Sequence, residues 1–275
     1  MLVLLPPSEG KASPEPEPGG GAQAALRLDA LSLPGLTQAR ERVLAELVAL
    51  CEGAAQDDTK AREVLGLSEG LRGEIVRNAA LRTAPVRPAG EIYTGVLYDA
   101  LGLGSLDGAA RERAGRWLLV FSGLWGALRV GDPIPSYRCS GGVKLPGTGG
   151  LGAFWRGPLE SVLPEAAGDG LVLDLRSSAY AAMWKPKGAL AERTATVRVL
   201  QSEVVGGVEK RSVVSHFNKA TKGRLVRSLL EDGAEPGTPE ELAGTLERLG
   251  HRVETAAPTR AGQPWRLDVV VTEVH

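Results

Sequence analysis

The chain has 275 residues, of which 43% are hydrophobic and 24% are charged, ordinary proportions for a globular protein with a buried core. A net charge of −1 argues against a strongly basic nucleic-acid binder, and no apolar run approaches the roughly 18 residues of a membrane span. The two cysteines, Cys51 and Cys139, form no CxxC pair, so we expect no disulfide framework. Together with the lack of a secretory signal, this predicts a cytoplasmic protein.

Charge is unevenly distributed along the chain. From Arg113 to Arg227 there are 17 Lys and Arg against 8 Asp and Glu, a net charge of +9. The remainder has 15 against 25, a net charge of −10. Such asymmetry favours an anionic partner for the basic region, although chance segregation of solvated charge would give the same pattern.

In the first half of the chain the pattern predicts a buried strand at Leu2–Leu5 and an amphipathic helix at Thr37–Glu52, with Thr37 as its cap. Residues 13–23 are low in complexity and predict a mobile surface loop. Asp58–Leu81 predicts two short helices joined at LGLSEG. This arrangement is typical of a helix-hairpin-helix that binds a DNA backbone, but any pair of antiparallel helices has the same pattern.

The second half predicts further short strands and amphipathic helices. The strands are expected at Trp117–Phe121, Leu171–Leu175, Thr196–Gln201, Val213–His216 and Leu267–Val271. A short helical turn is expected at Leu124–Leu128, and helices at Asn218–Leu230 and Pro239–Leu249. Intermixed strands and helices without a repeat predict a single α/β (mixed α+β) domain over 1–275, with a mixed sheet flanked by helices and a basic cleft at the strand ends.

The first strand runs into PPSEGK, which has the strand, turn, Gly and Lys of a phosphate loop. The Walker A pattern requires Gly six residues before the Lys and Ser or Thr after it, whereas this chain has Leu5 and Ala12 there. The pattern therefore excludes that class of nucleotide triphosphatase. Ser8 and Lys11 remain site candidates because they follow a strand end, where α/β sheets place their ligands.

Two Gly-flanked segments follow in the basic region. FSGLWG places Ser122 in a turn without the G-x-S-x-G elbow, and Trp125 is a core residue or a stacking platform. PSYRCSGGVK carries Tyr137, Arg138 and Lys144 in a loop suited to phosphate or carboxylate.

Two further groups of polar residues follow the strand at Leu171–Leu175. In LDLRSSAY, Ser178 is a catalytic candidate or a helix cap. In WKPK, Lys185 and Lys187 suit nucleic acid or an exposed helix end. Three scattered histidines and two distant cysteines provide no metal-ligand spacing, so neither a metal nor a cofactor is expected.

The segment VVSHFNKATKGRLVRSLL places Lys219 and Lys222 in the first turn of a predicted helix, the end that disfavours cations. A helical wheel of about 100° per residue places both in the apolar, core-facing sector, and Arg224 and Arg227 on the outer face. Inward-facing lysines require a compensating anion or carboxylate. Asn218 and His216 adjoin them.

Six segments, in order over nearly the whole chain, resemble the YaaA peroxide-stress family: MLVLLPPSEGK, IYTGVLY, FSGLWGALRVGDPIPSYR, FWRGPL, DLRSSAY and VVSHFNKATKGRL. The resemblance implies one cytoplasmic domain of unusual mixed α/β fold with a basic cleft. It also implies DNA binding, a helix-hairpin-helix at 58–81, and a role in limiting damage from hydrogen peroxide and free iron. That segment lacks a G-x-G turn and is rich in acidic residues, which argues against hairpin-based DNA binding here.

Two hypotheses follow, and both expect a monomer whose partner is DNA or a nucleotide-like anion. In the first, DNA binds a cleft that contains these residues: Lys11, Tyr93, Ser122, Trp125, Arg129, Tyr137, Arg138, Lys144, Lys185, Lys187, His216, Asn218, Lys219 and Lys222. In the second, the same cleft is an enzyme site for a nucleotide, nucleoside or base, cleaving a glycosidic bond or modifying the base. Its catalytic residues would be Ser8, Lys11, Ser178 and Lys219.

Overall fold

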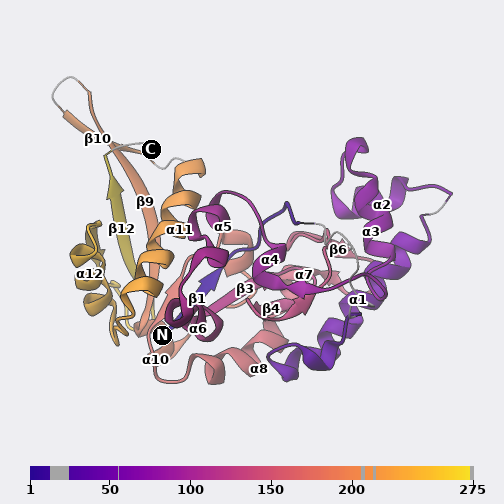
Figure 1. Cartoon of the computed structure of the whole chain (residues 1–275), viewed down its shortest axis with the longest axis horizontal. Coiled ribbons are helices and arrows are strands. Elements are labelled where there is room, and N and C mark those ends of the chain that lie inside the picture. Colours follow the sequence, from indigo (N-terminus) through magenta and orange to yellow (C-terminus); the bar gives the residue numbers. More distant parts are fainter. Residues whose placement is uncertain (13–24, 55, 206–207, 213–214, 273–275) are drawn as a thin grey trace.

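The computed structural model describes residues 1–12, 25–54, 56–205, 208–212 and 215–272. An eight-stranded sheet runs through the molecule (Figure 1). In spatial order its strands are β11 (Arg252–Ala256), β12 (Trp265–Val271), β9 (Thr194–Val205), β8 (Val172–Asp174), β1 (Leu2–Leu5), β3 (Leu118–Ser122) and β4 (Gly126–Arg129). The eighth strand, β10 (Val208–Ser212), pairs with β9.

The N-terminal strand lies inside the sheet. β1 runs parallel to β3 on one side and to β8 on the other, β8 is parallel to β9, and β9 is parallel to β12. The strands β4, β10 and β11 pair antiparallel with their neighbours. All four residues of β1 are buried, as expected for a strand covered on both faces and read as a continuous apolar run.

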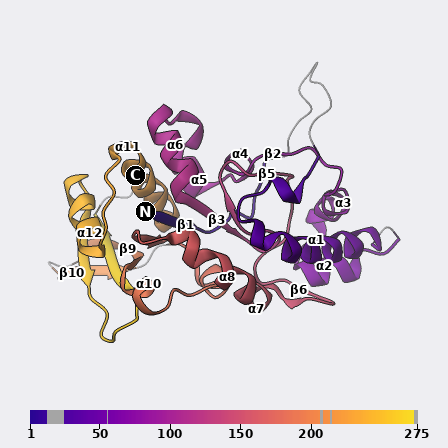
Figure 2. The same cartoon turned by 90° about the horizontal axis from the view of Figure 1, so that it is seen from below.

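Helices cover the central strands on both faces (Figure 2). One face carries α5 (Val96–Leu101), α6 (Gly108–Trp117) and α11 (Ser215–Asp232), and the other carries α7 (Leu151–Phe154), α8 (Arg156–Ala167) and α10 (Gly188–Glu192). Beside the β11 end of the sheet lies α12 (Pro239–Arg248), which packs on β11. No helix of the described residues is both long and apolar enough to span a bilayer.

A second group of elements lies beyond β4 at the opposite end of the molecule (Figures 1 and 2). It contains α1 (Thr37–Glu52), α2 (Thr59–Leu65), α3 (Gly73–Ala79) and the short hairpin of β6 (Lys144–Leu145) and β7 (Gly149–Gly150). The remaining short elements are β2 (Arg87–Pro88), α4 (Ala89–Ile92), β5 (Pro133–Ile134), α9 (Ser178–Ala181) and 3-10 turns at Leu28–Ala30, Pro34–Leu36, Glu69–Leu71 and Leu103–Ser105.

Helices α11 and α5 pack unusually close, because α11 has a glycine at the crossing. A Cβ atom on Gly223 would lie 2.2 Å from the carbonyl oxygen of Leu97, a distance that no real side chain tolerates. Further along α11, the Arg227 guanidinium donates hydrogen bonds to the carbonyls of Leu101 and Gly102 at the end of α5. The prediction that Arg227 is ordinary outer-face charge is therefore wrong.

The mixed α/β class predicted from the sequence is confirmed, and so are the bounds of β1 and α1. Thr37 does not cap α1; it is the first helical residue, after Leu36. The helical turn expected at Leu124–Leu128 is wrong, because Gly126 begins strand β4, which pairs with β3.

Two other boundaries also move. Trp117 ends α6 and does not begin the following strand. Ser215 and His216, expected in a strand, are helical, so α11 begins three residues earlier than predicted. The predicted loop at 13–23 lies outside the described residues.

Candidate functional site

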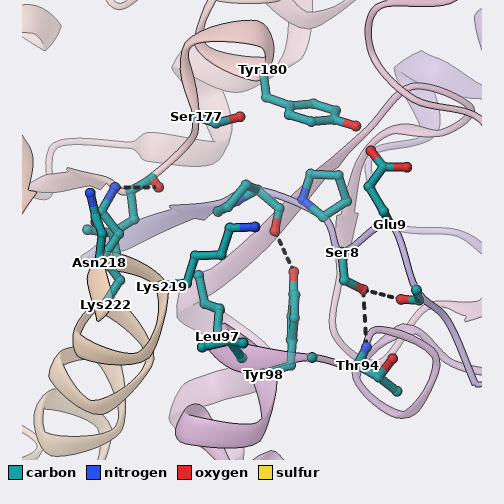
Figure 3. A pocket seen from close by; sticks show the side chains of 16 residues that line it. Ser8, Glu9, Thr94, Leu97, Tyr98, Ser177, Tyr180, Asn218, Lys219 and Lys222 are labelled. Atoms are coloured by element: carbon teal, nitrogen blue, oxygen red, sulfur yellow. Dashed lines mark hydrogen bonds between the residues drawn. The ribbon is translucent and has the colours of Figure 1, made fainter. Parts of the chain in front are cut away.

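A pocket of about 550 Å³ opens at the carboxyl ends of β1 and β8 (Figure 3). The chain crosses from β3, on one side of β1, to β8 on the other, so β1 is the point where the strand order reverses. Open α/β sheets bind ligands in the crevice at such a point. The lining residues are Pro6 to Gly10, Thr94 to Tyr98, Leu175, Ser177, Tyr180, Asn218, Lys219 and Lys222.

Helix α11 supplies the cationic end of the pocket. Asn218, Lys219 and Lys222 share one face because residues three and four apart are neighbours on a helix. Lys222 is partly buried and its Nζ donates a hydrogen bond to the carbonyl oxygen of Leu175, 3.2 Å away. Lys219 is exposed at the mouth and extends toward the middle of the pocket (Figure 3).

The charge of the cationic end is only weakly compensated by the protein. Burial lowers the pKa of Lys222, and the nearby carboxylate of Asp174 opposes that shift. Asp174 is itself bound on both oxygens by the buried Arg176, at 2.9 and 2.6 Å. The two lysines therefore present net positive charge to the pocket.

Asn218 lies beside the lysines with part of its side-chain amide unused. Its Oδ1 is buried and has no hydrogen-bond partner in the described part of the chain. Buried polar atoms are normally paired, so this oxygen lacks a partner that the described residues do not supply. The amide nitrogen and oxygen exchange places by a rotation, so Asn218 offers a donor or an acceptor.

The opposite wall is the PPSEGK turn, which is held in shape by its own hydrogen bonds. The Ser8 hydroxyl donates to the Gly10 carbonyl at 2.6 Å and accepts from the Thr94 amide at 3.1 Å. Glu9 is held by Arg138, whose Nη1 donates to the Glu9 carbonyl at 3.1 Å and whose Nη2 lies 3.4 Å from the carboxylate. Figure 3 shows Glu9 on the side of the pocket away from Lys219 and Lys222.

Lys11 holds this turn in place by a hydrogen bond, and it does not line the pocket. Its Nζ donates to the Ser8 carbonyl at 2.8 Å and lies 4.2 Å from the Tyr137 ring centroid and 5.5 Å from that of Tyr93. Burial lowers the pKa of Lys11 to about 8, although the carboxylate of Glu9 opposes the shift. The aromatic faces partly replace the water that the ammonium loses.

Beneath Lys11 lies a buried chain of hydroxyl groups. Ser122 and Tyr137 share a hydrogen bond of 2.6 Å, and Tyr137 and Tyr93 share one of 2.8 Å. Ser122 also accepts from the amides of Leu124 and Trp125. These hydroxyls are satisfied within the core and do not face the pocket.

Comparison with known proteins identifies the family of the chain. A family model described as peroxide stress protein YaaA matches residues 1–257. The chain belongs to this YaaA family. The resemblance carried by the six sequence segments is thus confirmed.

Relatives match all or most of the chain. A UPF0246 protein of Streptomyces coelicolor is 66% identical over 275 residues, covering 100% of both chains. UPF0246 proteins of Corynebacterium efficiens and Corynebacterium glutamicum are 45% and 40% identical over 258 residues, each covering 92% of this chain and 95% of the relative.

The structure brings only part of the predicted site together. Ser8, Asn218, Lys219 and Lys222 line the pocket of this YaaA-family protein, and Lys11 and Arg138 lie behind its wall. Lys219 and Lys222 lie on α11 after its first turn, and not at its N-terminus as predicted. The side chain of His216 lies outside the described residues.

Other predicted residues lie in the core or elsewhere on the surface. Trp125 is fully buried and cannot stack on a base. Arg129, on β4, donates to the carbonyl of Arg116, and Lys144 is exposed on the β6–β7 hairpin. Lys185 and Lys187 line a second pocket beside Glu160, whose carboxylate lies 3.0 Å from Lys187. The eight predicted cleft cations therefore do not form one cleft.

The segment expected as a helix-hairpin-helix does contain two helices, α2 and α3, but its arginines are paired with acids. Asp58 binds both Arg62 and Arg72 at 2.9 Å. Arg77 lies 2.5 Å from Glu74. These carboxylates compensate the positive charge that a DNA backbone would require.

Sequence reasoning missed several pocket residues. Ser177, and not Ser178, lines the pocket, as do Glu9, Tyr180 and the start of α5. Tyr180 is fixed by the Gly141 amide, which donates to its hydroxyl at 3.0 Å, and Tyr98 donates to the Pro6 carbonyl at 2.7 Å. The family segments IYTGVLY and DLRSSAY contain most of these residues and were the signal available. No group of three or more potential metal ligands occurs among the described residues.

Proposed function

We propose that this YaaA-family protein binds DNA during peroxide stress, and that the strand-end pocket receives the phosphate of one nucleotide unit. The observation that carries the proposal is the placement of Lys219 and Lys222 in one pocket, with Asn218 beside them. Ammonium groups and amide N–H groups are the usual ligands of phosphate oxygens.

The geometry favours a single unpaired nucleotide over a duplex laid along the surface. A volume of about 550 Å³ falls within the range of small-molecule sites and admits one nucleotide. Duplex binders commonly neutralise six to ten phosphates. Here the remaining predicted cations are dispersed, and two of them, Arg138 and Lys187, have carboxylate partners.

In this proposal the protein works in the cytoplasm on DNA strands that peroxide damage has opened. Occupying the unpaired nucleotides would keep iron-dependent oxidation away from them. The role of the family in peroxide stress and the phosphate-sized cationic end support the proposal together.

A second candidate is an enzyme that acts on a nucleotide or nucleoside in the same pocket. The observation that favours it is the presence of the Ser8 hydroxyl and the Lys219 amine on facing walls of one pocket. Purified protein incubated with a panel of purine and pyrimidine nucleotides, followed by mass spectrometry, tests it. Unchanged substrates would remove this candidate and leave the binding function standing.

The binding function is tested by removing the two lysine charges. The double variant Lys219→Met, Lys222→Met should bind a fluorescein-labelled single-stranded oligonucleotide at least tenfold more weakly in an anisotropy titration. The reason is that hydrogen bonds to charged groups contribute roughly 1.5–3 kcal/mol each.

The matched control is Arg224→Met, which removes an exposed cation from the same helix. It should change the affinity by less than twofold, and both proteins should keep the wild-type melting temperature within a few degrees. Equal losses in both variants would show a diffuse charge effect and contradict the proposal.

A further inference from the structure

The pocket has two ends of opposite charge. Lys219 and Lys222 lie at one end, while the Glu9 carboxylate lies on the other side (Figure 3). We propose that the pocket selects a guanine nucleotide, with its phosphate at the lysines and the N–H groups of its base at Glu9. The inference rests on the proposed function and adds the identity of the base.

Glu9 is built to accept hydrogen bonds. Arg138 holds the backbone carbonyl of Glu9 and approaches Oε2 at 3.4 Å, which fixes the residue and leaves Oε1 without a hydrogen bond in the described part of the chain. An ionised carboxylate only accepts, so its natural partner is a group with N–H donors. The side chain of Glu9 is 53% exposed, so a ligand can reach it.

Guanine is the base whose pairing edge suits a carboxylate. It presents two adjacent donors, N1–H and the N2 amino group, which match the two carboxylate oxygens. The edges of adenine and cytosine place a lone-pair nitrogen beside a single amino donor, and thymine has one N–H between two carbonyls. Those three edges direct at least one lone pair at the carboxylate, which is repulsive.

The opposite charges also fix the direction in which the ligand enters. A phosphate next to Glu9 would be repelled, whereas at the α11 end it meets Lys219, Lys222 and the side-chain amide of Asn218. Tyr180 lines the pocket between the two ends, and Figure 3 shows its ring between Ser177 and Glu9. A base held at Glu9 would contact this ring, and aromatic rings stack on any base without selecting it. Selection therefore falls to Glu9.

The guanine could come from two sources, a free mononucleotide or an unpaired residue in a DNA strand. Isothermal titration calorimetry with GMP, IMP and AMP, and with single-stranded oligonucleotides that differ by one G or A, separates them. GMP should bind ten- to a hundredfold more tightly than AMP, because a site built for a donor strongly rejects an analogue without it. IMP, which lacks the 2-amino group, should fall between them.

The variant Glu9→Gln tests the residue itself. It should reduce the preference for GMP over AMP at least fivefold while AMP affinity changes by less than twofold, which also shows that the pocket is intact. Glu63→Gln, an exposed position on α2, is the control and should keep the full preference. Selectivity seen only in the oligonucleotide arm identifies DNA as the source, and selectivity seen only with GMP identifies the free nucleotide.

Failure of this inference is distinguishable from failure of the proposed function. Equal affinities for GMP and AMP, with binding still lost in the Lys219→Met, Lys222→Met variant, overturn the guanine selection and leave phosphate binding intact. The absence of binding by every nucleotide and oligonucleotide would overturn both.

Discussion

At the scale of single residues, Lys11 shows how burial changes what a conspicuous side chain does. In the sequence, Lys11 follows a strand in a segment that resembles a phosphate loop. In the structure, its Nζ donates a hydrogen bond to the Ser8 carbonyl and lies against the rings of Tyr137 and Tyr93. Its position supports the PPSEGK turn and therefore the wall that carries Ser8 and Glu9. Lys11 therefore affects the pocket indirectly, by holding the backbone of the turn that forms one wall.

Because its pKa is lowered, Lys11 makes the free energy of unfolding depend on pH. Burial lowers the folded-state pKa to about 8 from an ordinary value of 10.5, so above pH 8 the unfolded chain binds more protons than the folded protein. Stability contributed at this site therefore rises with pH between about 8 and 10.5. The free energy of unfolding of the wild type, minus that of Lys11→Met, should increase by roughly 1–2 kcal/mol from pH 7.5 to 9.5.

Urea unfolding at several pH values measures this difference, in which other titrating groups cancel. Lys60→Met, at an exposed position of α2, is the matched control and should differ from wild type by a constant amount. A constant difference for Lys11→Met as well would show that the ammonium is not desolvated.

At the scale of elements, the crossing of α11 and α5 determines the width of the pocket. Both helices contribute lining residues, and they approach closely only because Gly223 has no side chain. Arg227 then fastens the end of α5 by its hydrogen bonds to Leu101 and Gly102. The pocket is thus bounded by a rigid helix pair on one side.

Gly223→Ala should lower the free energy of unfolding by roughly 2–3 kcal/mol, because its methyl group meets backbone atoms of α5 that must shift. Urea unfolding monitored by circular dichroism measures the change. Gly244→Ala, in α12 with open space around its Cβ, should instead raise stability by about 0.5–1 kcal/mol. A small effect at Gly223 would mean that the helices separate easily.

Elements were predictable where a continuous apolar run or one local period dominated the sequence. Leu2–Leu5 and Thr37–Glu52 are such cases, and their bounds agree with β1 and α1. The run around Gly126 was misassigned because a short apolar segment is compatible with the period of a helix and with that of a strand. Gly126 has a positive φ of 74°, and it begins a strand that is recognised only by its pairing with β3. The boundary at Ser215 was missed because a β-branched pair precedes it.

The site was less predictable than the fold. Lys219 and Lys222 could be identified because their helical spacing places them on the apolar side of α11. Glu9 and Tyr180 could not, since their distance from the lysines depends on which strands neighbour β1. Ser122 and Trp125 looked functional in a Gly-rich turn, but the turn is buried.

At the scale of the whole molecule, the net charge of a sequence region does not predict where positive charge gathers on the surface. The basic region from Arg113 to Arg227 carries +9, yet its cations are distributed over several faces and many are paired. Among the described residues, the predicted cleft cations therefore do not form one long positive groove. What remains for an anion is the local charge of the pocket.

This difference predicts a weak salt dependence of binding. With about two lysines meeting phosphate, the logarithm of the affinity for a single strand should fall with the logarithm of salt concentration with a slope of about −1.4. Anisotropy titrations between 50 and 300 mM NaCl measure it, and the Lys219→Met, Lys222→Met variant should show a slope near zero. A slope of about −5 or steeper would indicate an extended duplex footprint.

The interior position of β1 has a consequence for biosynthesis. Its five-residue neighbour β3 ends at Ser122 and its other neighbour β8 at Asp174, so β1 leaves the ribosome long before the two strands with which it pairs. At a translation rate of about 5–20 residues per second, the apolar segment LVLL stays without its partners for on the order of ten seconds or more. The nascent chain should therefore depend on chaperones that shield this apolar segment.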